Sequence, residues 1–185
     1  MTFTENNIKA RDVIITWLAS LPVTHHLTLS FHANTNHDET KKLLDLFFKH
    51  LNRRIYKGRY NKGLSYIRGI VIRENTPGLL TDHYHILILD EDRTLPDHGR
   101  LQSLISKTVR SLKGSSYRNR NHIKAYLLQP YSDEAGENRL EAYLLKSITG
   151  ILHKTSAFDQ IGCLDPDKVI FGQNFTDSEA YVKFL

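Results

Sequence analysis

The sequence predicts an α+β fold in which helices flank a central antiparallel sheet. Segments with helical spacing of apolar residues are interspersed with segments in which apolar and polar residues alternate. Two strand-like segments, 64–74 and 83–90, are separated by a turn that contains Pro77 and Gly78, so we expect an antiparallel hairpin. The expected order, α–β–α–β–β–α–β–α, is typical of a ferredoxin-like, split βαβ arrangement.

Each element follows from its own pattern. Apolar residues recur every three or four positions in the expected helices, which cover residues 6–21, 39–56, 96–112 and 139–153. The expected strands cover residues 26–32, 64–74, 83–90 and 122–129. Pro22 ends the first helix, and Asp38 is placed to cap the second. Beyond Thr155 the pattern weakens, with a short strand at 169–171 and a tail helix at 178–185 as candidates. We therefore expect one main domain over 1–154 and a C-terminal extension over 155–185.

Composition narrows the class of protein. The 185 residues carry a formal net charge of +5, which mildly favours a polyanionic partner such as nucleic acid. Cys163 is the single cysteine, which excludes a disulfide within the chain and a zinc site made of several thiolates. The single cysteine favours a reducing compartment, and no signal pattern begins the sequence, so we expect a cytoplasmic location. No apolar run approaches the length of about 18 residues that spans a membrane.

His83, Tyr84 and His85 carry the sharpest chemical signal. On a strand, residues i and i+2 share a face, so both imidazoles project together and Tyr84 points away. If Glu74 on the preceding strand pairs with His83, then Ile72 pairs with His85 and the carboxylate joins the imidazoles. A shift of one residue would send Glu74 to the other face. Two histidines and a carboxylate suit a divalent ion, although an isolated His-x-His is more often one buried and one surface histidine.

Tyr143 is the candidate nucleophile. It lies in the last expected helix, three residues before Lys146, so the two side chains share a helix face. A phenol is a poor nucleophile at pH 7, and a nearby ammonium group or a metal-polarised phosphate would assist it. Taken alone, a core tyrosine beside a solvated lysine is the more common arrangement.

Two basic segments contain no acidic residue. They run from Lys49 to Lys62 and from Arg100 to Lys124, and tyrosines lie among the cations. Such stretches suit the backbone and bases of single-stranded nucleic acid, and solvated helix ends and loops have the same composition. The candidate DNA-binding residues are Lys57, Arg59, Arg110, Lys113, Arg118 and Arg120.

The ordered set of these motifs resembles the replication initiators, or Rep proteins, of the HUH endonuclease superfamily. The Leu27–Phe31 strand looks like the first family motif, His83-Tyr84-His85 like the second, and Tyr143 with Lys146 like the third. The resemblance covers about residues 27–153 and implies the ferredoxin-like HUH endonuclease fold. It also implies a Mg²⁺ or Mn²⁺ ion on Glu74, His83 and His85, and nicking and joining of single-stranded or hairpin DNA at a replication origin through a 5′-phosphotyrosine on Tyr143.

Departures from the family pattern refine this expectation. Position 147 is Ser147, so the second tyrosine of the two-tyrosine subgroup is missing and a single nucleophile is inferred. Lysine follows the tyrosine where the related transposases usually have glutamine, which favours a Rep protein. No phosphate-binding GxxxxGK[ST] motif occurs, so unwinding is expected from a separate helicase. The alternatives are a single-tyrosine transposase, a non-catalytic DNA-binding module, and a structural α+β domain with accidental motifs.

Overall fold

The computed structural model describes residues 14–32, 37–74, 83–114, 123–131, 161–166 and 168–171. Within these ranges the chain is an α+β structure with a six-stranded antiparallel sheet. Its strands are β1 (Val23–Phe31), β2 (Arg68–Glu74), β3 (His83–Leu89), β4 (Ile123–Pro130), β5 (Ile161–Asp165) and β6 (Lys168–Phe171). Its helices are α2 (His37–Tyr56), α3 (Gly58–Asn61) and α4 (His98–Gly114), and residues 14–19 are also helical. The strand order is β4-β1-β3-β2-β5-β6.

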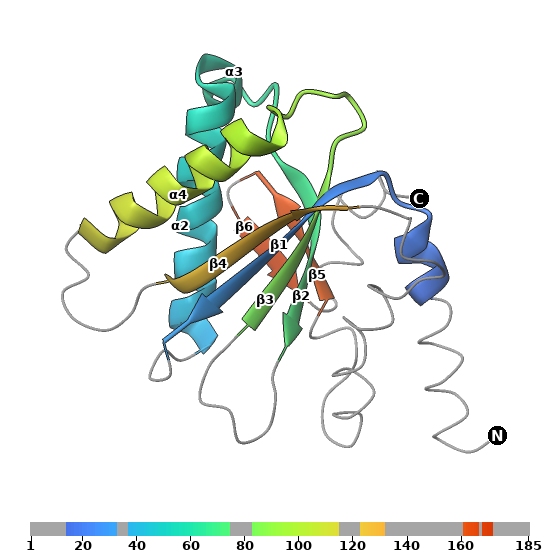
Figure 1. Cartoon of the computed structure of the whole chain (residues 1–185), viewed down its shortest axis with the longest axis horizontal. Helices are drawn as coiled ribbons and strands as arrows, with labels where there is room; N and C mark the ends of the chain where they lie inside the picture. Colours follow the sequence, from blue (N-terminus) through green and yellow to red (C-terminus); the bar gives the residue numbers. More distant parts are fainter. Residues whose placement is uncertain are drawn as a thin grey trace.

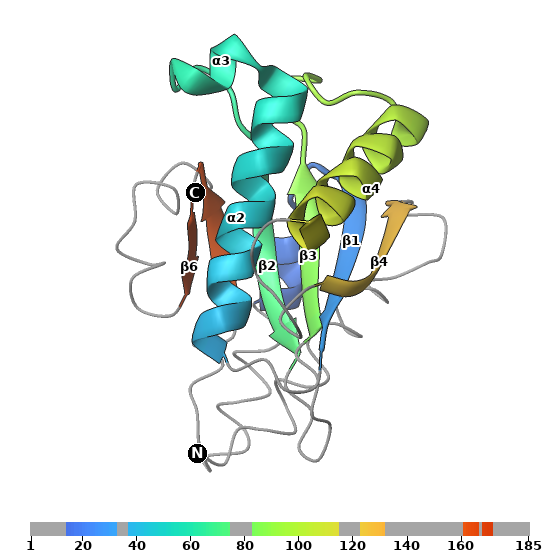
Figure 2. The same cartoon turned by 90° about the vertical axis from the view of Figure 1, so that its left-hand side faces the viewer.

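Helices lie on both faces of the sheet (Figure 1). The helices α2 and α4 cover one face, and Figure 2 shows them crossing in front of the strands. The helical residues 14–19, blue at the right of Figure 1, lie on the other face. Each strand in the middle of the sheet therefore sends alternate side chains into two different environments.

The larger core fills the space between the sheet and α2 and α4. Apolar residues recur along α2 at helical spacing, so one side of this helix is buried, and Leu44, Phe47 and Leu51 are fully enclosed. A smaller core on the opposite face joins Ile14 and Leu18 to apolar side chains of β2, β3 and β5. This second cluster covers only part of its face, and the rest carries polar side chains.

The sequence predicted most of these elements with small shifts at their ends. Residues 64–67 precede β2 instead of beginning it, and α2 begins at His37, so Asp38 lies in the first turn and not at the cap. The strand β5 was not expected. It pairs with β2, and β6 pairs with β5, so part of the segment expected as a C-terminal extension belongs to the sheet. The expected helix at 139–153 lies outside the described residues.

No described helix has the length and apolar character needed to cross a lipid bilayer.

Candidate functional site

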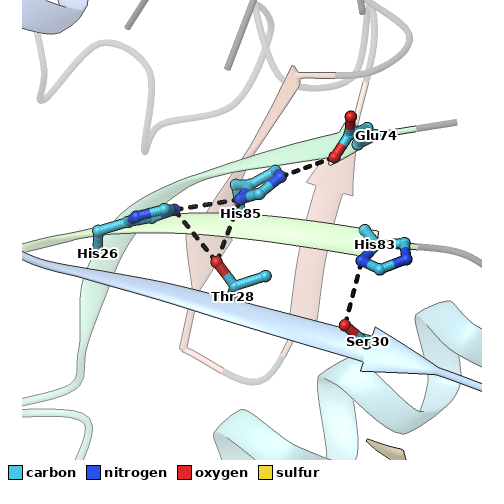
Figure 3. Close-up of polar contacts among 6 residues, drawn as sticks. All are labelled: His26, Thr28, Ser30, Glu74, His83 and His85. Atoms are coloured by element: carbon cyan, nitrogen blue, oxygen red, sulfur yellow. Dashed lines mark hydrogen bonds and ion pairs between the residues drawn. The ribbon is translucent and has the colours of Figure 1, made fainter. Parts of the chain in front are cut away.

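The hairpin of β2 and β3 brings the predicted site residues to one face of the sheet. Glu74 lies opposite His83, and Ile72 lies opposite His85. Residues paired in this way share a face, and so do residues two apart on a strand. The carboxylate of Glu74 and the imidazoles of His83 and His85 therefore all project from the face that carries the smaller core (Figure 3).

Glu74 and His85 are in direct contact. The Nε2 atom of His85 lies 3.0 Å from Oε2 of Glu74, which is hydrogen-bonding distance. His85 is 6% exposed, whereas Glu74 is only half-buried. The pair thus joins a buried ring to a carboxylate that reaches solvent.

His83 contacts a different residue. Its Nδ1 atom lies 3.1 Å from Oγ of Ser30, which is the residue opposite it on β1. In Figure 3 the His83 ring is turned toward β1, whereas the His85 ring contacts both neighbouring strands. The structure therefore unites two of the three predicted metal ligands and places the third on the same face beside them.

Tyr84 points to the opposite face, as the alternation of strand residues predicted. It is completely buried, and its hydroxyl lies 2.9 Å from Oγ1 of Thr40 and 3.4 Å from Nδ1 of His37. Its ring meets Phe31 edge-on, with centroids 5.5 Å apart. Tyr84 thus anchors β3 to the start of α2, at the end of the strand where the site lies.

Two residues that the sequence did not single out complete the polar cluster. His26 and Thr28 lie on β1, which runs beside β3. The Nε2 atom of His26 lies 3.1 Å from Nδ1 of His85, and Oγ1 of Thr28 lies 3.3 Å from the same atom. The sequence signals were the alternation of His26, Thr28 and Ser30 with apolar residues and the match of the Leu27–Phe31 strand to the first family motif, and neither signal identifies the partner of this face.

Electrostatics keep His26 neutral. Burial, and then the neighbouring His85 imidazole, lower the pKa of His26 to about 4. At pH 7 the His26 ring is therefore uncharged, and each of its nitrogens either donates or accepts a hydrogen bond according to the tautomer.

The Glu74–His85 contact has the spacing of two adjacent metal ligands. Two donor atoms bound at right angles to one ion about 2.1 Å away are about 3.0 Å apart. Nε2 of His85 and Oε2 of Glu74 have this separation, 3.0 Å. Among the residues that the structure describes, no three histidine, cysteine or acidic side chains are gathered into a complete ligand set. The donor types fit a divalent ion, and the predicted third ligand, His83, contacts Ser30 instead.

Of the predicted DNA-binding residues, the three whose side chains the structure describes lie away from this pair. Lys57 and Arg59 are exposed beside and within α3, at the end of the sheet opposite the arrowhead of β2, which ends at Glu74 (Figures 1 and 2). Arg110 is exposed on α4, which packs on the other face of the sheet. Lys113 is the residue before the last one of α4. Four further predicted residues lie outside the described ranges, namely Arg118, Arg120, Tyr143 and Lys146.

Comparisons with protein-family models, curated proteins and solved structures found no match.

Proposed function

We propose that the protein is a single-tyrosine endonuclease of the HUH type that nicks and rejoins single-stranded or hairpin DNA at a replication origin. The observation that supports this most is the register of β2 and β3, which gathers a glutamate and two histidines on one sheet face. A surface of this composition suits phosphoester chemistry assisted by a divalent ion. In this proposal the antiparallel sheet with its flanking helices is the ferredoxin-like HUH fold.

Glu74, His83 and His85 would hold the ion, which we propose to be Mg²⁺ or Mn²⁺. When bound, the ion would supply Lewis-acid polarisation of the scissile phosphate. The chain's own contribution is to orient the donors. Glu74 and His85 already lie within 3.0 Å, and His83 would exchange its hydrogen bond to Ser30 for the ion. His85 is buried, which limits the motion of its ring.

Tyr143 would carry out the substitution at phosphorus. Its phenolic oxygen forms a new bond to phosphorus while its proton passes to solvent, and the bond between phosphorus and the 3′ oxygen breaks. That oxygen takes up a proton and leaves as a free 3′-OH, and the 5′ end of the cut strand stays on Tyr143. Lys146 would offset the negative charge that develops on the phosphate. Because the phosphotyrosine is itself a phosphodiester, attack by a 3′-OH reverses the step and joins strands.

The DNA is expected to bind chiefly through its phosphates. The net charge of +5 favours this, and Lys57 and Arg59 near α3 and Arg110 on α4 are exposed cations. A separate helicase would unwind the duplex. A transposase with the same chemistry would differ in its target, rejoining the ends of an element instead of leaving a primer for replication.

The decisive experiment follows each half of a labelled oligonucleotide. Wild-type protein is incubated with Mn²⁺ and a pool of single-stranded and hairpin DNAs, and the products are separated under denaturing conditions. A 3′ label should move onto the protein, and a 5′ label should appear on a shortened strand that a polymerase extends. Tyr143→Phe should abolish the labelled protein band, because it removes only the attacking oxygen. Tyr126→Phe, on strand β4, is the matched control and should react like wild type.

Three results would contradict this assignment. Label transfer by Tyr143→Phe would exclude that tyrosine as the nucleophile. DNA binding without cleavage on any substrate would favour a non-catalytic module. Efficient strand transfer between hairpin ends, with no extendable 3′-OH accumulating, would favour the transposase.

A further inference from the structure

The strand β1 presents a row of polar side chains to the two histidines of β3. Thr28 lies opposite His85 and Ser30 lies opposite His83, and each hydroxyl approaches the Nδ1 atom of the histidine across from it. His26, one step further along the same face, also contacts Nδ1 of His85. We call His26, Thr28 and Ser30 the polar row of β1. In both histidines it is Nδ1 that faces this row (Figure 3).

The contacts around His85 constrain where its proton lies. An ionised carboxylate only accepts hydrogen bonds, so in its contact with Glu74 the Nε2 atom of His85 is the donor. In a neutral ring Nδ1 is then an acceptor, and His26 or Thr28 donates to it. For Nε2 to give its lone pair to a cation, the proton must instead occupy Nδ1. There it would donate to Nε2 of His26 or to Oγ1 of Thr28.

His26 and Thr28 can each form a hydrogen bond with Nδ1 of His85 whether that atom accepts or donates. A threonine hydroxyl donates and accepts, and a neutral imidazole nitrogen does one or the other according to its tautomer. Oγ1 of Thr28 lies 3.4 Å from Nε2 of His26, so His26, Thr28 and His85 form a closed triangle of hydrogen-bonding atoms. The rings of His26 and His85 also stack, with centroids 5.3 Å apart and an angle of 28° between their planes. Both histidines of this triangle are buried, and Thr28 is half-buried.

We propose that His26 and Thr28 are positioning residues that hold the His85 ring and accept a hydrogen bond from its Nδ1–H when Nε2 binds a cation. Neither residue touches the reacting atoms in this proposal. Their role is to fix the direction in which Nε2 points and to stabilise the tautomer that has a lone pair there. The choice of cation as the ligand of Nε2 rests on the function proposed above, whereas the tautomer control rests on the observed contacts alone.

The test uses the intact chain and two readouts that do not involve cleavage. The first is the tautomer of His85 in the metal-free protein, measured by long-range ¹H–¹⁵N NMR at mildly alkaline pH, where a histidine is ordinarily neutral. The second is the affinity for Mn²⁺ without DNA, measured by titration calorimetry. The variants are His26→Phe, which keeps a flat ring, and Thr28→Val, which keeps the shape of threonine and removes its hydroxyl. Thr28→Ser restores a hydroxyl, and Thr24→Val, elsewhere on β1, is the matched control.

We expect His26→Phe and Thr28→Val each to change the ratio of His85 tautomers and to weaken Mn²⁺ binding by about 10- to 100-fold, the usual effect of losing a group that orients a ligand. Thr28→Ser should recover most of the affinity, and Thr24→Val should match wild type. Folded variants with wild-type tautomer ratios and wild-type Mn²⁺ affinity would overturn the proposal. If His26→Phe does not fold, Thr28→Val alone decides the outcome, because its side chain has the same shape as threonine.

The two proposals fail in different ways. If wild type does not bind Mn²⁺ but the variants still shift the His85 tautomer, the proposed endonuclease loses its metal and the positioning role stands. If wild type binds Mn²⁺ and cuts DNA but neither variant affects the tautomer or the affinity, the endonuclease stands and the positioning role is refuted.

Discussion

His85 is held from two sides, by Glu74 on β2 and by His26 and Thr28 on β1. A ring with partners at both nitrogens has one favoured orientation, because rotation about its side-chain bonds would break the contacts on both sides. Preorganisation of this kind places a ligand within the small tolerance that a metal site or an active site requires. His83 has a different neighbour on β1, because its Nδ1 atom lies 3.1 Å from Oγ of Ser30.

Removal of the negative charge of Glu74 tests whether this single residue is a metal ligand. Glu74→Gln keeps the shape of the side chain and removes the negative charge that attracts a divalent ion. We expect Mn²⁺ affinity to fall by about 10- to 100-fold or more, with little change in the free energy of unfolding, because the amide oxygen of glutamine can still accept the hydrogen bond from Nε2 of His85. Titration calorimetry and urea unfolding measure the two effects. Glu91→Gln, which removes an exposed ion pair with Arg68, is the matched control. Equal Mn²⁺ affinities in the two variants would argue against Glu74 as a ligand.

His25 makes stability depend on pH in a region separate from the site. Its ring stacks on His98, with centroids 5.5 Å apart. Burial, and then the His98 imidazole, lower the pKa of His25 below 6.5, although Asp90 acts in the opposite direction. The unfolded chain therefore binds the proton more readily than the folded one. The stabilisation is complete above the unfolded pKa of about 6.5 and is lost as the pH falls through the folded pKa.

The variant His25→Phe isolates this contribution. It keeps a flat ring against His98 and removes the titrating group, so the free energy of unfolding should fall less steeply with acidification than in wild type. Urea unfolding at a series of pH values measures the two slopes. Parallel curves for wild type and variant would show that His25 does not titrate differently in the folded and unfolded chain.

At the scale of elements, α2 holds together segments that are far apart in the sequence. Asn52 is fully buried, accepts a hydrogen bond from the backbone N–H of Ile67 at 2.7 Å and donates one to the carbonyl of Pro166 at 3.0 Å. Two helical turns earlier, Asp45 accepts one from the backbone N–H of Val169 at 2.6 Å. One face of α2 thus fixes the approach to β2 and the hairpin of β5 and β6.

The variant Asn52→Leu should destabilise the protein by about 2–4 kcal/mol. Leucine has a volume similar to that of asparagine, but it cannot hydrogen-bond to the N–H of Ile67 or to the carbonyl of Pro166. Each buried polar group that loses its hydrogen bond costs about 1–3 kcal/mol. The urea midpoint measures the change. Asn61→Leu, at an exposed position in α3, should stay within about 0.5 kcal/mol of wild type. Similar midpoints for the two variants would mean that Asn52 does not have this structural role.

The elements that the sequence predicted have either strong periodicity or a long run of strand residues. The helices α2 and α4 and the strand β1 show periodicity, and β2, β3 and β4 lie in longer strand-like segments, so the types of these elements were correct even where their ends shifted. The strand β5 has four consecutive buried residues and no alternation, and its place depends on the open side of β2, which only the tertiary structure supplies. The His-x-His face was predictable because alternation is a local property. The contact of His26 with His85 was not, because it depends on β1 lying beside β3.

At the scale of the whole molecule, the late segment 161–171 is part of the sheet that carries the site. Ile161, Leu164 and Val169 are buried in the two cores, with at least one in each. Burial of such side chains stabilises a protein by about 1.5–3 kcal/mol each. The three together contribute about 5–9 kcal/mol, which is comparable to the whole stability of about 5–15 kcal/mol of a typical domain.

A chain that ends at residue 154 should therefore fail to fold cooperatively. It would expose the edge of β2 and open both cores. Amide dispersion in NMR spectra and the urea unfolding curve are the measurements, and a chain that ends just after β6 is the control. A shortened chain with a sharp unfolding transition would show that residues 1–154 form an independent domain and that the hairpin of β5 and β6 is dispensable.

Along the seven residues of β3, side chains of the polar cluster alternate with side chains of the apolar core. His83 and His85 face the polar cluster, while Tyr84 and Ile86 between and after them are buried in the core on the opposite face. Substitutions can therefore alter one of these two sets at a time, since neighbouring positions face different surroundings. A deletion or insertion of one residue has no such freedom, because it would turn the histidines into the apolar core and the tyrosine toward Glu74 in a single event. The strand β3 can therefore tolerate single substitutions, but a change of one residue in its length would disrupt both the polar cluster and the apolar core.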